Sequence, residues 1–355
     1  MNDNNLGLPP RSEGPAPALP SSGRAGFIFA DRESYRKAWD ASETLDPEVP
    51  LCVDLELASL CGLRCPTCFW GDSGFQKEMG GASPVMSKQL MPTELAIRLV
   101  LEAAKIGVPS LKFHGRGDGI HHRDYVEILR FAADMRESVA ARGGFLELLI
   151  NTHGNSAYSK MDGLVLADKV MLSIDSVVPA TYTKMRVGGR LGDVIWTAEE
   201  LLKRGHKNVW VRRVITDDNR HENFVDDCKA IFGPKVHVSE HFAFNHRNSQ
   251  KVSVHHEDES SWGRRFCQYP SVRLMCLANG DVVPCCVDWR AEMVVGNVNS
   301  QSLAEIWTGQ PIRKLRAELR AGVLTSSVCK SCTSFQSYSR PERKFVSDHE
   351  GKAVI

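Results

Sequence analysis

The feature that most constrains the fold of this chain is an alternation of apolar, strand-like runs with longer helical stretches between residues 50 and 245. Such an alternation is typical of βαβ units, which build a parallel sheet. About six units fit in this span, too few for a closed eight-stranded barrel. We therefore expect an α/β fold with an open, partial (β/α)6 barrel that is similar to a TIM barrel. The expected strands are Leu51–Leu57, Ser110–Phe113, Leu146–Ile150, Lys169–Ile174, Val209–Ile215 and Val236–Phe242.

The expected helices carry apolar residues at helical spacing. Pro92 breaks or begins the second of them, because proline lacks the backbone N–H that a helix interior needs. The helices are expected at Asp31–Ala41, Met86–Ile106, Tyr125–Ala140, Asp193–Lys203 and Asn223–Ile231.

Composition excludes several classes of partner. The formal net charge of +1 gives no long-range attraction to nucleic acids or anionic membranes, and no basic run is interleaved with aromatic residues. No apolar stretch approaches the roughly 20 residues that span a bilayer, and the polar N-terminal segment lacks the apolar core of a signal peptide. We therefore expect a cytoplasmic protein with neither a nucleic-acid nor a membrane partner.

The chain contains 11 cysteines, a high count for the reducing cytoplasm, so clustered cysteines are interpreted as metal ligands or reactive thiols. Cys61, Cys65 and Cys68 follow directly on the first expected strand with the spacing Cys-x3-Cys-x2-Cys. Thiolates at this spacing can hold an iron–sulfur cube and leave one iron open. A zinc knuckle is the alternative, but it needs a fourth ligand that no neighbour obviously supplies.

The C-terminal region has a different pattern and is expected to form a second, smaller domain. Val272–Leu277 and Val282–Cys285 flank Asn279-Gly280, which predicts a β-hairpin with a type I′ turn. A single helix is expected over Leu303–Leu319.

A second group of cysteines lies in this region. Cys267 and Cys285 flank the hairpin in the pattern Cys-x12-Gly-x4-Cys, and Cys329 and Cys332 form a late Cys-x2-Cys. Judged on ligand type alone, four thiolates can hold zinc as easily as an iron–sulfur cluster.

The first cysteine motif resembles the signature of the radical S-adenosylmethionine (SAM) superfamily, which lies after the first strand of a partial (β/α)6 barrel. The resemblance implies that Cys61, Cys65 and Cys68 hold a [4Fe–4S] cluster whose open iron binds SAM. Reductive cleavage of SAM would then give a 5′-deoxyadenosyl radical, with the electron coming from a reductant of the flavodoxin or ferredoxin type. The cofactors would supply the hard chemistry, and the protein would place them and exclude water.

The same resemblance implies SAM contacts at the ends of later strands. The run from His114 to Asp118 stands in the place of the family's Gly-Gly-Glu motif, so Asp118 would replace the glutamate and the glycines would let the backbone approach the methionine amino group. The ends of the third and fourth strands would contact the ribose and the methionine carboxylate, and Arg186 matches a carboxylate-binding position. The implied residues are Gly115, Gly117, Asp118, Asn151, Ser173, Asp175 and Arg186.

The second group of cysteines resembles the SPASM and twitch extensions of radical SAM enzymes, which hold auxiliary [4Fe–4S] clusters. No cysteine follows Cys332, which favours the shorter, twitch-like form. The resemblance implies that one auxiliary cluster has four protein ligands, Cys267, Cys285, Cys329 and Cys332.

Four cysteines remain outside the two groups. Cys52 and Cys228 are expected to be small, buried side chains of apolar character. Cys276 and Cys286 lie in the hairpin, and Cys276 is a candidate hydrogen donor to a substrate radical.

The first residues of the chain are rich in Pro, Gly and Ser and cannot bury enough apolar surface to fold. The expected segments are a disordered tail (1–25), a helical lead-in (26–49), the radical SAM partial barrel (50–245), a linker (246–261), a twitch/SPASM-like domain of a β-hairpin and a helix (262–340) and a C-terminal tail (341–355).

The predicted function is a radical SAM oxidoreductase that abstracts hydrogen from a small molecule, namely a sugar, an aminocyclitol or a related secondary metabolite. The auxiliary cluster would accept an electron during dehydrogenation, and epimerisation is the close variant. Twitch-type aminocyclitol dehydrogenases resemble this chain in the spacing of their auxiliary cysteines. The alternatives are modification of a ribosomal peptide and a non-catalytic zinc or iron–sulfur module. The sequence assigns no acid–base role to His114, His121, His122 or His153.

Overall fold

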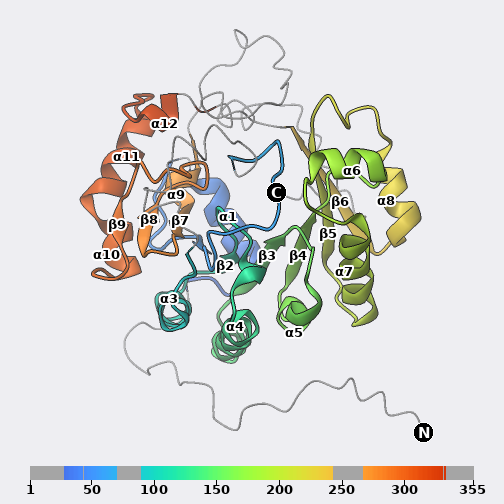
Figure 1. Ribbon diagram of the computed structural model, residues 1–355. Coiled ribbons are helices and arrows are strands. Elements are labelled where there is room, and N and C mark those ends of the chain that lie inside the picture. Colours follow the sequence, from blue (N-terminus) through green and yellow to red (C-terminus); the bar gives the residue numbers. More distant parts are fainter. Residues whose placement is uncertain (1–27, 43, 70–88, 243–266, 331, 333–355) are drawn as a thin grey trace, which may run out of the picture.

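The computed structural model describes residues 28–42, 44–69, 89–242, 267–330 and 332 (Figure 1). The predicted tails at 1–25 and 341–355 and the predicted linker at 246–261 lie outside the described residues. No helix in the described part of the chain is long and apolar enough to cross a membrane.

The strands of the described residues form one mixed sheet. They are β1 (Cys52–Leu55), β2 (Ser110–Phe113), β3 (Glu147–Thr152), β4 (Lys169–Ser173), β5 (Val209–Ile215), β6 (Val236–Phe242), β7 (Arg273–Cys276), β8 (Asp281–Val283) and β9 (Gly296–Asn297). Their order is β6-β5-β4-β3-β2-β1-β7-β8-β9. The strands β1 to β6 are parallel to their neighbours, which confirms the predicted partial barrel.

Helices follow the strands and cover the outside of the barrel. The α-helices are α1 (Arg32–Ala41), α3 (Thr93–Ile106), α4 (Tyr125–Ala140), α5 (Met161–Leu164), α6 (Pro179–Met185), α7 (Leu191–Lys203), α8 (Phe224–Phe232), α9 (Tyr269–Val272), α10 (Leu303–Thr308), α11 (Gln310–Arg320) and α12 (Ser327–Lys330), with 3-10 turns η2 (Gly119–His121) and η3 (Tyr158–Lys160). Figure 1 shows α3, α4, α5, α7 and α8 arranged one after another around the outside of the sheet.

Alternation along the strands gives the sheet two unlike faces, because successive side chains point to opposite sides. Val53, Leu111 and Leu148 belong to the main hydrophobic core, which lies between the sheet and the helices. The other face, which carries Asp54 and Lys112, lines the barrel interior. The helix-facing side therefore stabilises the fold, and the polar interior is available for a site.

The helical lead-in covers the end of the sheet at which β1 and β7 begin. Tyr35 and Trp39 of α1 pack with Leu51 and Val272 in a separate apolar cluster. The guanidinium of Arg273 lies 5.9 Å from the centroid of the Trp39 ring. The barrel is thus covered here at its amino-terminal end, and the functional loops lie at the other.

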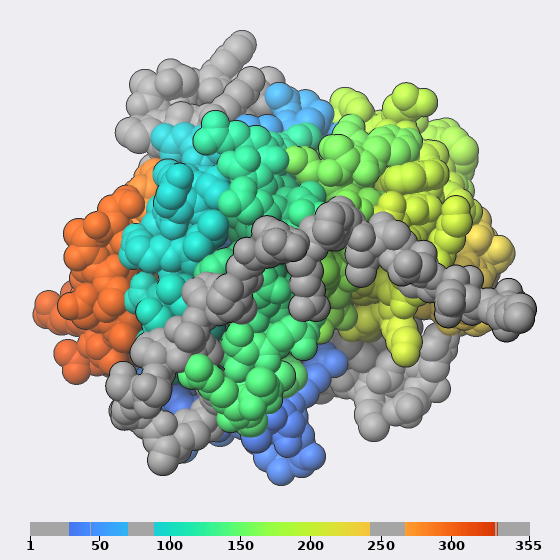
Figure 2. Space-filling view, turned by 90° about the horizontal axis from the view of Figure 1, so that it is seen from below, coloured from blue at the N-terminus to red at the C-terminus, as the bar shows by residue number. Residues whose placement is uncertain are grey.

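The C-terminal region extends the barrel sheet across the boundary predicted at residue 262. β7 pairs in parallel with β1, and β8 and β9 follow as antiparallel strands. The Leu303 N–H donates to Glu102 of α3 at 2.5 Å, and Arg98 of α3 donates to the Val298 carbonyl at 2.6 Å. Figure 2 shows the orange C-terminal elements directly against the cyan residues of α3.

Two local predictions for this region are wrong. The hairpin turn is not type I′, because only Gly280 has a positive φ (91°), and its N–H donates to the Leu277 carbonyl at 2.8 Å. This is the three-residue arrangement of a tight turn followed by a left-handed glycine. The predicted single helix is two helices, α10 and α11. Gly309 is extended between them and Pro311 begins the second, since proline is favoured in a first helical turn.

Candidate functional site

The first cysteine group lies on the loop that leaves the carboxyl end of β1. Cys65 is buried, whereas Cys61 and Cys68 are half-buried. Burial and the charges of Asp118, Cys65 and Cys68 together raise the pKa of Cys61 to about 12, so the three thiols are electrostatic neighbours. The Cys68 N–H donates to the Cys65 carbonyl at 3.0 Å in a tight turn. Three thiols grouped on one loop fit a cube with one open iron better than a single ion with four ligands.

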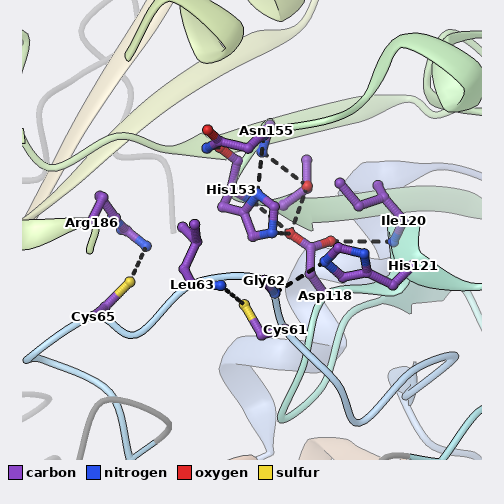
Figure 3. A network of polar contacts seen from close by, with 12 residues as sticks. Cys61, Gly62, Leu63, Cys65, Asp118, Ile120, His121, His153, Asn155 and Arg186 are labelled. Atoms are coloured by element: carbon purple, nitrogen blue, oxygen red, sulfur yellow. Dashed lines mark hydrogen bonds and ion pairs between the residues drawn. The ribbon is translucent and has the colours of Figure 1, made fainter. Parts of the chain in front are cut away.

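Arg186 brings a positive charge to this loop. Its Nη1 lies 3.8 Å from the Cys65 sulfur, and Figure 3 shows the guanidinium pointing at that thiol. The Nε of Arg186 is 2.7 Å from Oδ2 of Asp175, whose Oδ1 accepts from the Val214 N–H at 2.8 Å. Asp175 has a positive φ of 62°, a conformation that short polar residues tolerate. Asp175 therefore orients Arg186, and Arg186 faces the cluster loop.

Asp118 joins the cluster loop to the end of β3. Its N–H donates to the Leu60 carbonyl at 2.9 Å, and its Oδ2 accepts from Thr152 Oγ1 and the His153 N–H, both at 2.8 Å. The Ile120 N–H donates to Oδ1 at 3.3 Å. The buried carboxylate therefore accepts hydrogen bonds from groups of the protein itself. Its contact with the methionine amino group stays a prediction.

Two histidines complete this network. The Gly62 N–H donates to Nε2 of His121 at 3.2 Å, next to the first cysteine of the motif. The His121 and His153 rings have centroids 5.6 Å apart, and Figure 3 shows both beside Asp118. Burial lowers the pKa of His153, which favours its neutral form. Nothing in the sequence favoured His121 and His153 over His114 and His122 as site residues. His122 bonds to the Met91 carbonyl at 2.7 Å, so its role is structural.

Gly115 and Gly117 are required because neighbouring parts of the chain lie too close to admit a side chain. A Cβ on Gly117 would lie 2.3 Å from the Leu60 carbonyl oxygen, and one on Gly115 would lie 2.5 Å from Cγ of Glu56. The prediction gave both glycines a contact with SAM. Their observed contacts are with the cluster loop and with the residue after β1.

Replacing Gly117 with alanine is expected to lower the free energy of unfolding by about 1–3 kcal/mol, because backbone atoms must move to admit the methyl group. The displaced residue, Leu60, precedes Cys61, so less iron should be incorporated. Gly192 is the matched control, since its Cβ would meet no atom within 4 Å. Gly192→Ala should be neutral or stabilising by up to about 1 kcal/mol. Urea unfolding and iron content measure both effects, and equal results for the two variants would contradict the prediction.

Asn151 and Ser173 lie on the barrel-facing side of β3 and β4. Both are half-buried, and the residues beside them, Ile150 and Leu172, belong to the hydrophobic core on the opposite face. Their position suits contacts with a molecule inside the barrel, but the contacts with SAM stay a prediction.

The second cysteine group converges from three segments. Cys267 precedes α9, Cys285 follows β8, and the charges of Cys329 and Cys332 raise the pKa of Cys267 beyond what burial alone does. Burial raises the pKa of Cys329 to about 11. In the described part of the chain, no three His, Cys, Asp or Glu side chains meet closely enough to hold a single metal ion.

The two unassigned hairpin cysteines lie in different environments. Cys276 is fully buried in the core between the sheet and the helices, on the face opposite to the barrel interior. This position does not favour the predicted donation of a hydrogen atom to a substrate in the barrel. Cys286 instead lies near His114, Arg273 and Asp54, which act on it electrostatically. The sequence did not distinguish the two because the register of β7 decides which face Cys276 takes, and Cys286 lies in the turn after β8.

A buried ion pair that the sequence did not predict joins the two cysteine regions. The fully buried Glu56 accepts from Arg116 Nε at 2.7 Å and from Arg116 Nη2 at 2.6 Å. Its Oε1 also accepts from the Ala278 N–H of the hairpin at 3.1 Å. Phe69, next to Cys68, stacks on Trp289 with centroids 4.7 Å apart. The sequence signal for this pair was the presence of two charged residues, Asp54 and Glu56, in the otherwise apolar predicted strand Leu51–Leu57.

Comparison with known proteins agrees with this arrangement. Residues 267–333 match the SPASM family, an iron–sulfur cluster-binding domain. The structure of SuiB from Streptococcus suis bound to S-adenosylmethionine has a TM-score of 0.61 and 14% identity, over 86% of this chain and 76% of that one. At this identity the likeness establishes the fold alone, a partial barrel with a C-terminal extension.

Two curated relatives match parts of the chain. The S-adenosyl-L-methionine-dependent 2-deoxy-scyllo-inosamine dehydrogenase of Niallia circulans is 27% identical over 89 residues, 25% of this chain and 36% of the relative. The GTP 3',8-cyclase of Mycolicibacterium smegmatis is 29% identical over 143 residues, 40% of this chain and 36% of the relative. Each match spans little more than a third of the relative's length. These similarities confirm the predicted resemblance to radical SAM enzymes and to the SPASM domain.

Proposed function

We propose that this chain is a radical SAM oxidoreductase. The observation that carries the proposal is the grouping of Cys61, Cys65 and Cys68 on the loop after β1, with Arg186 against Cys65. These cysteines would hold a [4Fe–4S] cluster and Arg186 would face the carboxylate of SAM. When bound, the cluster and SAM would supply a 5′-deoxyadenosyl radical that abstracts hydrogen from the substrate. Asp175 holds the guanidinium in place.

The proposed substrate is a sugar, an aminocyclitol or a related secondary metabolite, which would be dehydrogenated or epimerised. The name of the Niallia circulans relative supports this class, as does the polar barrel interior. Cys267, Cys285, Cys329 and Cys332 would hold an auxiliary [4Fe–4S] cluster, because all four lie in the region that matches the SPASM domain. Four protein ligands would leave that cluster without an open iron, which suits electron transfer rather than SAM binding.

The protein, reconstituted with iron and sulfide under anaerobic conditions and reduced with dithionite, is expected to cleave SAM to 5′-deoxyadenosine and methionine. Liquid chromatography with mass spectrometry measures both products. A control without dithionite should give neither, because cleavage needs an electron. Absence of 5′-deoxyadenosine from a protein that holds its full iron and sulfide would refute the proposed function.

A further inference from the structure

Three cationic side chains from different strands point into the barrel. Lys112 lies on β2, Lys169 on β4 and Arg212 on β5. The residues next to them in sequence belong to the hydrophobic core on the other face of the sheet, so strand alternation turns all three toward the interior.

The cations are close enough to act on one another. Burial lowers the pKa of Lys112, which Asp54 opposes and Arg273 and Arg212 reinforce. Burial and the charges of Arg212 and Lys112 together lower the pKa of Lys169 to about 7, and the charge of Glu147 opposes them. Lys112 and Lys169 therefore belong to a group of positively charged side chains on the barrel-facing side of the sheet.

The carboxylates on the same side of the sheet have other partners. Asp54 pairs with Arg273 at 3.1 Å and with His114 at 3.3 Å. Glu147 lies 3.8 Å from Arg32. Across the part of the chain that the structure describes, neither Lys112 nor Lys169 forms an ion pair with a carboxylate.

Arg273 on β7 supplies a further buried donor on the barrel-facing side of the sheet. Arg273 is 8% exposed, and its Nε has no hydrogen-bond partner among the described residues. Its neighbour Leu274 belongs to the core, so Arg273 also points inward. Buried donors are normally satisfied by protein, water or a ligand, and this one therefore marks a place for an acceptor.

We propose that the barrel binds a substrate with an anionic group, a phosphate or a carboxylate, and that Lys112 and Arg212 select it. This inference rests on the proposed radical SAM function and names its substrate class. An anion would relieve the repulsion among the cations, and their attraction is stronger in a water-poor interior than in solvent. Because α1 covers the opposite end, the group would enter past the cysteine loop, with SAM nearer the mouth beside Arg186.

The test is isothermal titration of the reconstituted, SAM-saturated protein with three probes. Inorganic pyrophosphate represents a phosphate group, malonate represents a carboxylate, and myo-inositol is the neutral probe. Saturation with SAM prevents the probes from binding where its carboxylate belongs. The variants are Lys112→Gln and Arg212→Gln, with Lys112→Arg as the conservative rescue and Lys105→Gln as a control at an exposed site.

Binding of pyrophosphate or malonate that weakens about tenfold or more in Lys112→Gln or Arg212→Gln supports the proposal and identifies the group, since a hydrogen bond to a charged group accounts for an effect of this size. Lys112→Arg and Lys105→Gln should bind like the unaltered protein. The proposal is overturned where neither anion binds, where myo-inositol binds as well as the anions, or where all variants bind alike. SAM cleavage is measured separately, so loss of cleavage with intact anion binding would refute the oxidoreductase and leave the anion site standing.

Discussion

Replacing Cys65 with alanine is expected to abolish reductive cleavage of SAM and to remove about half of the protein-bound iron, because one of two cubes loses a ligand. Cys65 is the most buried thiol of its group and the one that Arg186 contacts. Without its sulfur, the remaining two thiols on the loop cannot hold the cube in place. Quantification of 5′-deoxyadenosine, iron and sulfide measures the outcome.

Cys228→Ala is the matched control. Cys228 is fully buried in α8 and belongs to the hydrophobic core, so its loss should cost some stability and leave iron content and SAM cleavage unchanged. Equal loss of cleavage in both variants would contradict a specific role for Cys65. Zinc in place of iron in the unaltered protein would favour the non-catalytic alternative.

The barrel was predictable because its signals are local. Runs of apolar residues alternate with helical periodicity, and several bounds agree to the residue, as for β2, α4, β5 and β6. The break at Gly309 was missed because the apolar spacing continues across it, while Pro311 begins a new first turn. The pairing of β7 with β1 was also missed, since residues more than 200 positions apart meet there.

The site, like the fold, has features that the sequence predicts and features that it does not. The cysteine groups are recognisable from spacing, because a short loop must bring thiols together whatever the rest of the chain does. The partners of Asp118 and Asp175 depend on neighbouring strand ends, which spacing does not reveal. The orientation of Cys276 depends on register, and one residue of shift would turn it from the core to the barrel.

Replacing Arg116 with methionine is expected to lower the free energy of unfolding by about 3–5 kcal/mol, because it leaves the charge of Glu56 buried without its partner. Glu56 is fully buried and Arg116 is 5% exposed, so solvent cannot compensate. Urea unfolding of the reconstituted protein under anaerobic conditions measures the change.

Arg130→Met is the control for this prediction. Arg130 pairs with Asp162 at 3.9 Å on the surface, with side chains 48% and 40% exposed. Loss of such a pair should cost about 0–1 kcal/mol. A similar small cost for Arg116→Met would show that the buried pair does not hold this part of the fold together.

A double variant, Glu56→Gln combined with Arg116→Met, tests whether the loss of stability comes from the buried charge or from the lost contacts. The double variant leaves no buried charge, and the glutamine amide oxygen can still accept from one of the two backbone N–H groups that donate to Glu56, that of Arg116 or that of Ala278. It should therefore recover part of the lost stability. Glu56 and Arg116 link the ends of β1 and β2 to the hairpin that precedes Cys285. Arg116→Met should therefore release iron to a chelator faster from both cysteine groups, whereas Cys65→Ala removes iron from one. If iron is released faster from only one cysteine group, the ion pair stabilises that group alone and does not link the two.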